Sequence, residues 1–267
     1  MKRLLAVLLA AMLVMMMAVP ALAEDDSLKK IQEKGKFILG LDDSFEPMGY
    51  RDENNEIVGF DIDLAKEVCA RLGVELVLQP ISWDAKEMEL SSGNIDCIWN
   101  GMSDTPERQE AMALSMDYLN NKMVFLAKDP AIKGREDLVG KKVGVQSGSY
   151  AQELLEGADF ADYYKSLGEV LGYADYPTAI MDLQNGNIEA VLIDQVVANY
   201  KLKDLGDSSL FTVDSLADDF YAIGFRKEDI ALRDAVNETL KAMAKDGKVA
   251  EISTKWFGSD ISLIAAN

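Results

Sequence analysis

The segment WNGMSDTPER, residues 99–108, places a guanidinium group at an unusual position. Thr105 followed by Pro106 predicts a helix start, with threonine as the N-cap and proline at the first helical position. Arg108 then falls in the first turn, where a cation is disfavoured by roughly 0.3–1 kcal/mol. A bound carboxylate would neutralise both the guanidinium and the positive helix end. The pattern therefore indicates an anion-binding position at Arg108.

A second charged residue is predicted to face this cation. Residues 90–98 are echoed by residues 183–191, and each copy reads as a helix end, a glycine, an acidic residue and an apolar strand. The first strand ends shortly before Arg108, and the second ends at Asp194. Ligands of open α/β sheets bind outside the carboxyl ends of strands. If two related lobes face each other, one positive and one negative group meet in one cleft, which is the pattern that complements a zwitterion.

Other interpretations of these residues are open at the level of sequence. Arg108 could pair with Glu107 or Asp104 at the surface, which is the commoner arrangement for a single arginine. Asp194 reads as a helix N-cap, a role that is compatible with ligand contact. Ser103 is typical of a turn hydroxyl.

The composition narrows the possible chemistry. The chain has no histidine, which excludes Ser-His-Asp and Cys-His catalysis and histidine-based zinc sites. Cys69 lies in a helical pattern and Cys97 in an apolar strand, which favours two buried free thiols over a disulfide. Residues 140–149, GKKVGVQSGS, lack the Gly-Lys-Ser/Thr of a phosphate loop. We therefore predict no catalytic residue, no metal site and no cofactor.

Charge and the amino-terminal segment indicate where the protein acts. The formal net charge of −19 disfavours binding to nucleic acid and anionic lipid. Lys2 and Arg3, the apolar run 4–19 and the Ala-x-Ala pattern ending at Ala23 predict a signal peptide over residues 1–23. A membrane anchor is the alternative, but the run is short for a span and an acidic segment follows it. With no cysteine near the cleavage site for lipid attachment, we expect a periplasmic or secreted protein.

The elements that must position these residues alternate between strands and helices. The length of 267 residues suits two domains or one large one. Helices are expected to begin at Thr105 and at Ser149, and their alternation with strands predicts an α/β fold with largely parallel sheets. The patterns predict strands over 36–41, 74–78, 95–99, 142–145 and 190–193, and helices over 60–72 and 230–244.

Residues 59–73, GFDIDLAKEVCARLG, resemble the signature of the family 3 extracellular solute-binding proteins, the amino-acid receptors of ABC importers. The resemblance implies a type II periplasmic-binding-protein fold, in which two α/β lobes joined by two crossover strands close over the ligand. It divides the chain into lobe 1, residues 24–121 and 219–267, and lobe 2, residues 122–218. Further similar segments occur in the family's order at 41–50, 92–108, 140–149, 190–200 and 222–229.

The resemblance also implies roles for individual residues. Arg108 would bind the α-carboxylate of the ligand. Ser103 and the region of Ser149 would donate hydrogen bonds to the same carboxylate. Asp194 would bind the α-ammonium group, together with the carbonyl of Gly101.

The side chain of the ligand would meet a different set of residues. Phe45 and Trp83 would flank it, and Asp42 would lie at its polar or cationic end. Asn100, between Trp99 and Gly101, stands where many family members carry small residues. The acidic residues at this end favour a basic or amide side chain such as that of arginine, lysine, histidine or glutamine: Asp42, Asp43 and Glu46.

The resemblance therefore predicts a monomeric binding protein that captures a free L-amino acid and passes it to the membrane permease of an ABC importer. No nucleic acid is expected as a partner. The alternative is an enzyme on the same fold, similar to the family's dehydratases, acting on an amino-acid-related carboxylate. A catalytic group on this fold would need a carboxylate or lysine with a shifted pKa in the cleft.

Overall fold

The computed structural model describes residues 25–205 and 209–264, so the predicted signal peptide lies outside the described residues. None of the described helices is long and apolar enough to cross a membrane. The strands are β1 (Lys36–Leu41), β2 (Ser44–Phe45), β3 (Gly49–Arg51), β4 (Ile57–Val58), β5 (Glu75–Pro80), β6 (Cys97–Ser103), β7 (Ala113–Leu114), β8 (Leu119–Ala127), β9 (Lys142–Gln146), β10 (Glu169–Tyr173), β11 (Ala190–Asp194) and β12 (Phe211–Phe225).

The helices follow the predicted alternation. The helix predicted over residues 60–72 has those bounds in the structure, and the C-terminal helix is one residue longer than predicted. The α-helices are α2 (Ser27–Lys34), α3 (Phe60–Leu72), α4 (Lys86–Ser91), α5 (Pro106–Ala111), α6 (Tyr150–Glu156), α7 (Ala161–Ser166), α8 (Tyr176–Asn185), α9 (Gln195–Leu205), α10 (Ile230–Lys245) and α11 (Lys248–Phe257), and short 3-10 turns cover Trp83–Ala85, Arg135–Leu138 and Ala158–Phe160.

One nine-stranded sheet runs through the molecule in the order β10-β9-β11-β8-β12-β6-β1-β5, with β7 paired to β12. The pairs β1–β5, β1–β6, β9–β10 and β9–β11 are parallel, as predicted. At the centre of the sheet the prediction of parallel strands is wrong. There β8 pairs antiparallel with β11 and β12, and β12 pairs antiparallel with β6, because the chain crosses from one end of the sheet to the other and returns.

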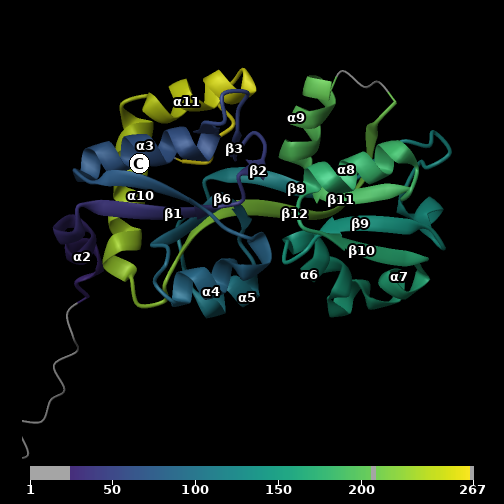
Figure 1. The fold of residues 1–267 in the computed structure, drawn as a ribbon, viewed down its shortest axis with the longest axis horizontal. Helices are drawn as coiled ribbons and strands as arrows, with labels where there is room; N and C mark the ends of the chain where they lie inside the picture. Colours follow the sequence, from purple (N-terminus) through teal and green to yellow (C-terminus); the bar gives the residue numbers. More distant parts are fainter. Residues whose placement is uncertain (1–24, 206–208, 265–267) are drawn as a thin grey trace, which may run out of the picture.

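Figure 1 shows that this sheet divides the molecule into two halves. The left half contains β1, β5 and β6, with α3, α10 and α11 on one face and α4 and α5 on the other. The right half contains β9, β10 and β11, with α8 and α9 above and α6 and α7 below. The long strands β8 and β12 lie side by side and connect the halves.

The sequence patterns did not locate the two central strands, β8 and β12, because polar residues interrupt the apolar alternation of these strands. Asn120 and Asn121 stand near the start of β8, and Asp218 and Asp219 lie in β12. Asn121 and Asp219 are buried, whereas Asn120 and Asp218 are exposed. The polar residues therefore alternate between the inside and outside of the molecule, as strand geometry requires, but without the apolar inner face that normally reveals a strand.

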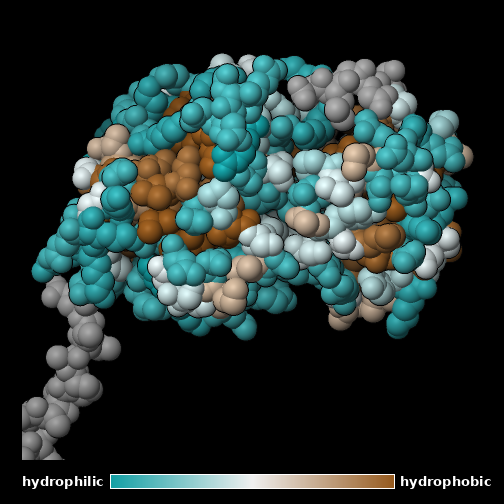
Figure 2. Space-filling model, in the orientation of Figure 1, coloured by the Kyte–Doolittle hydropathy of each residue, from teal (hydrophilic) through white to brown (hydrophobic). Residues whose placement is uncertain are grey.

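Apolar side chains fill the space between sheet and helices in both halves. The left half is packed around Phe37, Phe60 and Trp99, and the right half around Phe125 and Leu192, all of which are fully buried. The face seen in Figure 2 is mostly hydrophilic, with apolar side chains gathered over the left half where α10 and β1 lie. The packing fixes the strands whose carboxyl ends meet between the halves.

Candidate functional site

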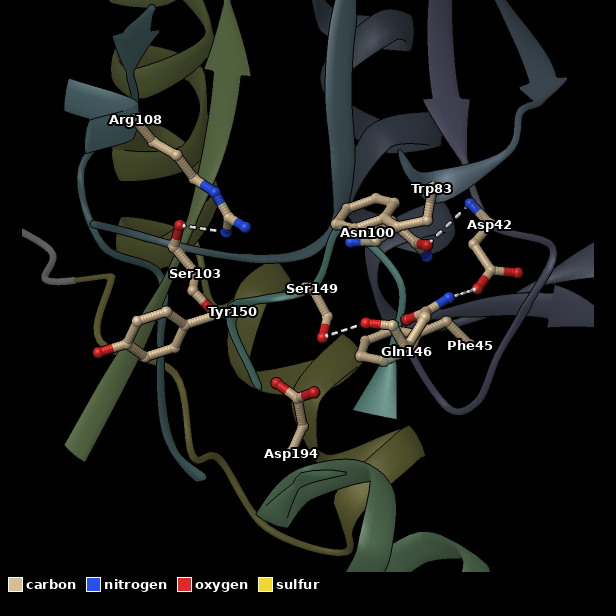
Figure 3. Close-up of a pocket in the computed structure, with 11 residues that line it drawn as sticks. Asp42, Phe45, Trp83, Asn100, Ser103, Arg108, Gln146, Ser149, Tyr150 and Asp194 are labelled. Carbon is tan, nitrogen blue, oxygen red and sulfur yellow. Dashed lines mark hydrogen bonds between the residues drawn. The ribbon is translucent and has the colours of Figure 1, made fainter. Parts of the chain in front are cut away.

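A pocket lies where the carboxyl ends of β6, β9 and β11 meet. Its position agrees with the rule that open α/β sheets bind ligands beyond the ends of their strands. Every residue to which the sequence analysis assigns a ligand contact lines this pocket, and two others join them. Asp43 and Glu46, the other acidic residues expected at the side-chain end, do not line it and pair with Arg51 and Lys201 instead. The lining residues are Asp42, Phe45, Trp83, Asn100, Gly101, Ser103, Arg108, Gln146, Ser149, Tyr150 and Asp194 (Figure 3).

Arg108 occupies the positive side of the pocket. Thr105 is the N-cap of α5, as predicted, and its hydroxyl accepts a hydrogen bond from the Arg108 backbone N–H. The guanidinium is buried, with Nη1 donating to the Ser103 carbonyl at 2.9 Å and Nη2 at 2.8 Å from Glu153 Oε1. The alternative of a surface pair with Glu107 or Asp104 is wrong, because the acidic partner comes from α6 in the other half.

The Nε atom of Arg108 has no hydrogen-bond partner among the described residues, although it is buried. One donor of the guanidinium group is therefore unsatisfied within the described protein. A carboxylate is the group that this planar fork binds best.

Asp194 occupies the negative side of the pocket, at the last position of β11. Its Oδ1 accepts hydrogen bonds from Asn121 Nδ2 at 2.7 Å and from the Tyr221 hydroxyl at 2.8 Å. Both donors are neutral, and no ion pair involves Asp194 within the part of the chain that is described. Burial raises the pKa of Asp194 to about 6, although its hydrogen bonds act in the opposite direction.

Gly101 brings β6 close to the pocket through a bulge. The β6–β12 register shifts between Ala222 and Gly224, which leaves extra residues on β6. Gly101 has φ of 59°, and a Cβ there would lie 2.8 Å from a Phe45 ring carbon. Only glycine fits this backbone conformation without strain.

The bulge is anchored from behind by a buried carboxyl group. The Gly101 N–H donates to Asp61 Oδ2 at 2.8 Å, and the Tyr118 hydroxyl donates to the same oxygen at 3.0 Å. Burial raises the pKa of Asp61 to about 7. Asp61 and Tyr118 do not line the pocket, but they hold the strand end that does.

The third side of the pocket is formed by Asp42 and Gln146, which lie away from both Arg108 and Asp194 in Figure 3. Gln146 Nε2 donates to Asp42 Oδ2 at 2.6 Å, which joins β9 of the right half to the segment after β1. Ser44 donates to the other carboxylate oxygen through its N–H and its hydroxyl. Burial raises the pKa of Asp42 despite these bonds.

Asn100 also belongs to this third side. Its Oδ1 accepts the Asp42 N–H at 3.0 Å, so its amide is oriented with Nδ2 as a donor. Nδ2 is buried and has no partner among the described residues. Nδ2 lies against Gly49, where an added Cβ would be 2.7 Å from it.

Aromatic rings form the remaining walls of the pocket, and a lysine packs against one of these rings. Phe45 packs against Tyr176 with ring centroids 5.9 Å apart, and Trp83 carries Lys86 Nζ 5.2 Å from its ring centroid. Lys86 Nζ donates to the Gly148 carbonyl at 2.7 Å, a second contact between the halves. Burial, and next the charge of Arg108, lower the pKa of Lys86 to about 8.

Ser149 begins α6, as predicted. Its hydroxyl accepts the Gln152 N–H at 3.4 Å and donates to the Gln146 carbonyl at 2.7 Å. Ser149 thus serves as a helix N-cap while it lines the pocket. Tyr150, the next residue, also lines the pocket.

Sequence reasoning missed Gln146 and Tyr150 as pocket residues, and it missed Asn121 and Asp219 behind the pocket wall. Gln146 directly follows the strand predicted over 142–145, so the strand-end rule that found Asp194 would also have found it. Asn121 and Asp219 lie inside the two crossover strands, whose residue ranges the sequence patterns did not locate, and no comparable signal marks these two residues.

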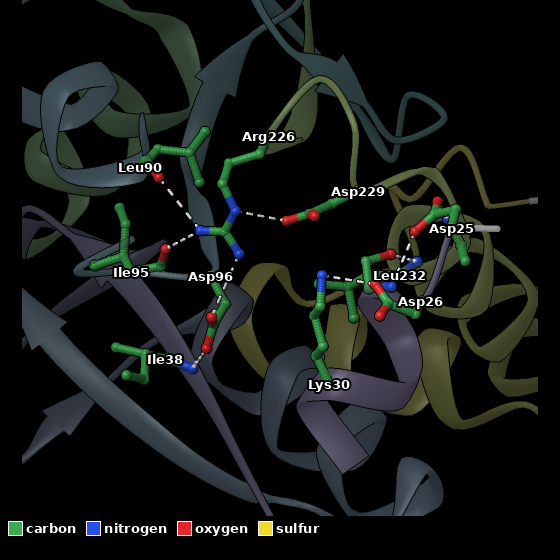
Figure 4. Close-up of polar contacts among 12 residues, drawn as sticks. Asp25, Asp26, Lys30, Ile38, Leu90, Ile95, Asp96, Arg226, Asp229 and Leu232 are labelled. Carbon is green, nitrogen blue, oxygen red and sulfur yellow. Dashed lines mark hydrogen bonds and ion pairs between the residues drawn. The ribbon is translucent and has the colours of Figure 1, made fainter. Parts of the chain in front are cut away.

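A buried ion network holds the start of β6 (Figure 4). Arg226 Nη1 donates to the carbonyls of Leu90 and Ile95, and its Nε lies 2.7 Å from Asp229 Oδ2. Asp96 accepts the Ile38 N–H at 2.7 Å and pairs with Arg226 at 3.5 Å. This network fixes the turn before β6, and through it the position of the strand that ends in the pocket.

The site offers separate contacts for an anion, a cation and a polar group, all fixed by surrounding structure. Among residues 25–205 and 209–264, no group of histidine, cysteine, aspartate or glutamate side chains is arranged to hold a metal ion. The two cysteines of the chain are free and buried. The arrangement suits non-covalent recognition of a small zwitterion.

Comparison with known proteins gives consistent matches. A sequence model of the bacterial extracellular solute-binding proteins, family 3, matches residues 37–259. The L-cystine-binding protein TcyJ of Escherichia coli K12 is 31% identical over 95% of this chain and 94% of its own, and ABC transporter arginine-binding protein 1 of that strain is 30% identical over 83% and 90%. The crystal structure of a Streptococcus pneumoniae ABC uptake transporter substrate-binding protein with bound histidine has a TM-score of 0.84 and 38% identity, covering 90% of this chain and 99% of that one.

Proposed function

The chain belongs to the family 3 bacterial extracellular solute-binding proteins, and we propose that it captures a free L-amino acid for an ABC importer. The observation that carries this proposal is the burial of Arg108 and Asp194 in one pocket, with exposed fractions of 2% and 5%. Two opposite charges facing one small cavity complement the carboxylate and ammonium groups of an amino acid. Arg108 binds the carboxylate, assisted by the N-terminus of α6 at Ser149, and Asp194 binds the ammonium group with the Gly101 carbonyl. The hydroxyl protons of Ser103 and Ser149 are donated to Asp219 and to the Gln146 carbonyl, so the predicted hydroxyl contacts of these serines with the carboxylate are not part of this proposal.

The third side of the pocket supports a polar ligand side chain. A side chain directed from Arg108 and Asp194 toward Asp42 would meet a carboxylate, the Asn100 and Gln146 amides, and the rings of Phe45 and Trp83. This set favours a basic or amide side chain, since a cation or an amide N–H complements Asp42. Arginine and histidine, named for two of the similar proteins above, agree with this preference, whereas cystine, named for the third, has a side chain that is neither basic nor an amide.

Contacts between the halves support capture by lobe closure. Gln146 bonds to Asp42, Lys86 to the Gly148 carbonyl, and Arg108 to Glu153, and each pair joins the left half to the right half. A fourth pair joins Lys201 of α9 to Glu46. We assign lobe 1 to residues 24–121 and 219–267 and lobe 2 to residues 122–218, with β8 and β12 as the crossover strands.

The protein would act as a periplasmic or secreted monomer that presents its closed form to the importer's membrane permease. Small-angle scattering should give a larger radius of gyration without ligand than with it, and sedimentation should give the mass of one chain. An unchanged radius on ligand addition would contradict closure but not binding.

The first test is a thermal shift series on residues 24–267, unfolded and refolded to remove carried-over ligand, against all twenty amino acids. A ligand at 1,000 times its dissociation constant adds about 4.1 kcal/mol to the free energy of unfolding. At roughly 2–4 °C per kcal/mol, the melting temperature rises by about 8–16 °C. A large shift confined to basic or amide amino acids would support the proposal, and no shift with any amino acid would reject it.

We further propose that the pocket binds its ligand without chemical change, so the protein is not an enzyme. The enzyme alternative, a dehydratase-like activity, requires turnover of an amino-acid-related carboxylate. Proton NMR of the stabilising amino acid, incubated with the protein overnight, separates the two. An unchanged spectrum supports binding alone, and a new product rejects it.

A further inference from the structure

Four side chains form a continuous hydrogen-bonded chain behind the pocket wall. Ser103 Oγ donates to Asp219 Oδ2 at 2.9 Å, and Asn121 Nδ2 donates at 2.7 Å both to that oxygen and to Asp194 Oδ1. Ser103 and Asp194 line the pocket, whereas Asn121 and Asp219 do not. The chain joins Ser103 on β6, whose carbonyl accepts a hydrogen bond from Arg108, to the proposed ammonium contact on β11, through the two long strands.

Two carboxyl groups therefore share one small buried volume. An oxygen of Asp194 and an oxygen of Asp219 lie at the same distance from one amide nitrogen, and the two residues are 5% and 3% exposed. Neither forms an ion pair with any described lysine or arginine. Arg108, the nearest buried cation of the pocket, is bonded to Glu153 and to the Ser103 carbonyl instead.

The neighbouring groups offer no positive charge either. Tyr221 donates its hydroxyl to Asp194, and Lys122, beside Asn121 in the chain, points outward to pair with Asp218. The titratable groups that face the pair from the adjoining elements are neutral or acidic: Asp104, Asp117, Tyr118, Tyr150, Tyr176 and Tyr221.

Ionising both carboxyl groups in this setting is costly. Two like charges in a low-dielectric site disfavour each other, and neutral hydrogen-bond donors compensate them only in part. Oδ1 of Asp219 is buried and has no partner in the described chain, so an ionised Asp219 would leave a charged oxygen unsatisfied. Burial, and next the charge of Asp194, raise the pKa of Asp219 to about 7.

We propose that Asp194 and Asp219 hold one proton between them in the empty pocket, and that the ammonium group of an incoming amino acid replaces this proton. The released proton passes to solvent, so the charge of the buried cluster stays constant. Asp219 is then a positioning residue that acts through Asp194 and never touches the ligand. The inference rests on the proposed function, because it assigns the ammonium group to Asp194.

The proton itself is tested without ligand. Infrared difference spectra of the refolded protein, recorded from pH 4 to pH 9, follow the carbonyl stretch of protonated carboxyl groups. We expect wild type to retain a protonated group near pH 6.5 that is missing in Asp219→Asn. Asp218→Asn is the matched control, since Asp218 is the exposed neighbour on β12, and it should match wild type. Identical spectra for wild type and Asp219→Asn would overturn the proposal, even if Asp61 contributes a band to both.

The exchange of proton for ammonium is tested by calorimetry with L-arginine as the probe, in phosphate and in Bis-Tris buffer, whose ionisation enthalpies differ. We expect wild type to release a proton on binding at pH 6.5, and its affinity to fall about tenfold from pH 8 to pH 6. Asp219→Asn should lose only about twofold over this range, because Asp194 titrates lower. If the affinities of wild type and Asp219→Asn for L-arginine change equally with pH, or if wild type releases no proton, the exchange is wrong. If Asp219→Asn loses the same affinity at every pH, the role of Asp219 is purely structural.

The two measurements separate the inference from the proposed function. If L-arginine and the other amino acids fail to bind, the proposed function fails, and the infrared spectra still decide whether the pair holds a proton. If L-arginine binds without proton release, the proposed function stands and this inference fails.

Discussion

The turn and strand that lead to Arg108 are built like the turn and strand that lead to Asp194. Asp96, before β6, accepts the Ile38 N–H of β1 at 2.7 Å, and Glu189, before β11, accepts the Lys142 N–H of β9 at 2.8 Å. The backbone N–H groups of both acids donate to the carbonyls of the same two neighbours. The internal echo in the sequence therefore corresponds to a shared local structure.

The two turn-and-strand units, one ending in β6 and the other in β11, differ at the carboxyl end of the strand. After β6 the chain makes a bulge and a capped helix that carry a cation, and this cation already has an anionic partner in Glu153. In the second unit the anion stands at the last position of β11 and has only neutral donors. A repeated scaffold thus carries opposite charges, and only the positive one is compensated within the described protein.

Asp194→Asn should have the largest effect, because it removes the charge that depends most on a ligand. We expect affinity for L-arginine at pH 8 to fall by about 3–5 kcal/mol in calorimetry. Burial raises the folded-state pKa of Asp194 to about 6, so wild-type stability falls as pH rises from about 4 to about 6 and stays lowered above that range. The ligand-free variant should therefore be more stable than wild type at pH 8 in urea unfolding. Lower stability at pH 8 would contradict the view that this anion is uncompensated.

Arg108→Ala should weaken ligand binding by about 2–4 kcal/mol. Unlike Asp194→Asn, it should lower the stability of the ligand-free protein. The truncation leaves the buried Ser103 carbonyl without its donor, so the ligand-free protein should lose about 1–3 kcal/mol. Arg108→Lys separates charge from geometry, since an ammonium group cannot replace the guanidinium fork. If Arg108→Lys binds as tightly as wild type, the carboxylate contact is misassigned.

Gly101→Ala tests the bulge that only the first unit has. An alanine at φ of 59° is strained, and its Cβ would approach the Phe45 and Tyr221 rings, so we expect a loss of about 2–3 kcal/mol in the free energy of unfolding. Gly93→Ala is the matched control, with φ of 79° and open space around the added atom. Gly93→Ala should cost less and keep ligand affinity. Equal losses in the two variants would show that the close packing at Gly101 is unimportant.

Glu153→Gln should have the smallest effect. The Glu153 side chain is 39% exposed, so solvent screens its pair with Arg108 and the pair is worth less than about 1 kcal/mol. Titrations of L-arginine at low and high salt should give affinities within about fivefold of wild type in both conditions. Glu156→Gln, one turn further along α6, controls for the loss of charge from this helix. A tenfold or greater change specific to Glu153→Gln would mean that the cation depends on this partner.

Much of the site was predictable because it obeys local rules. Thr105 and Pro106 predict a helix start, and the strand-end rule finds Ser103, Arg108 and Asp194 from local sequence alone. The helix over residues 60–72 was predictable for the same reason, since its apolar residues repeat at helical spacing.

The unpredictable part depends on contacts between distant residues. Glu153 reaches Arg108 only when the two halves meet, and no local pattern encodes that pairing. Asn121 and Asp219 lie in β8 and β12, whose inner faces are polar near the pocket. These polar residues interrupt the apolar alternation by which a strand is predicted from sequence. Polar residues near the pocket therefore break the regular hydrophobic pattern from which secondary structure is predicted.

The two free thiols have a practical consequence for studying this protein. Cys69 on α3 and Cys97 on β6 are almost fully buried in the left half, and burial raises the thiol pKa of both. A thiol reagent therefore modifies them only in molecules whose left half has opened. The rate of labelling then reports the rate of opening, and a ligand that stabilises the folded state slows labelling in proportion to its occupancy. Binding constants become measurable from labelling alone, without any engineered probe.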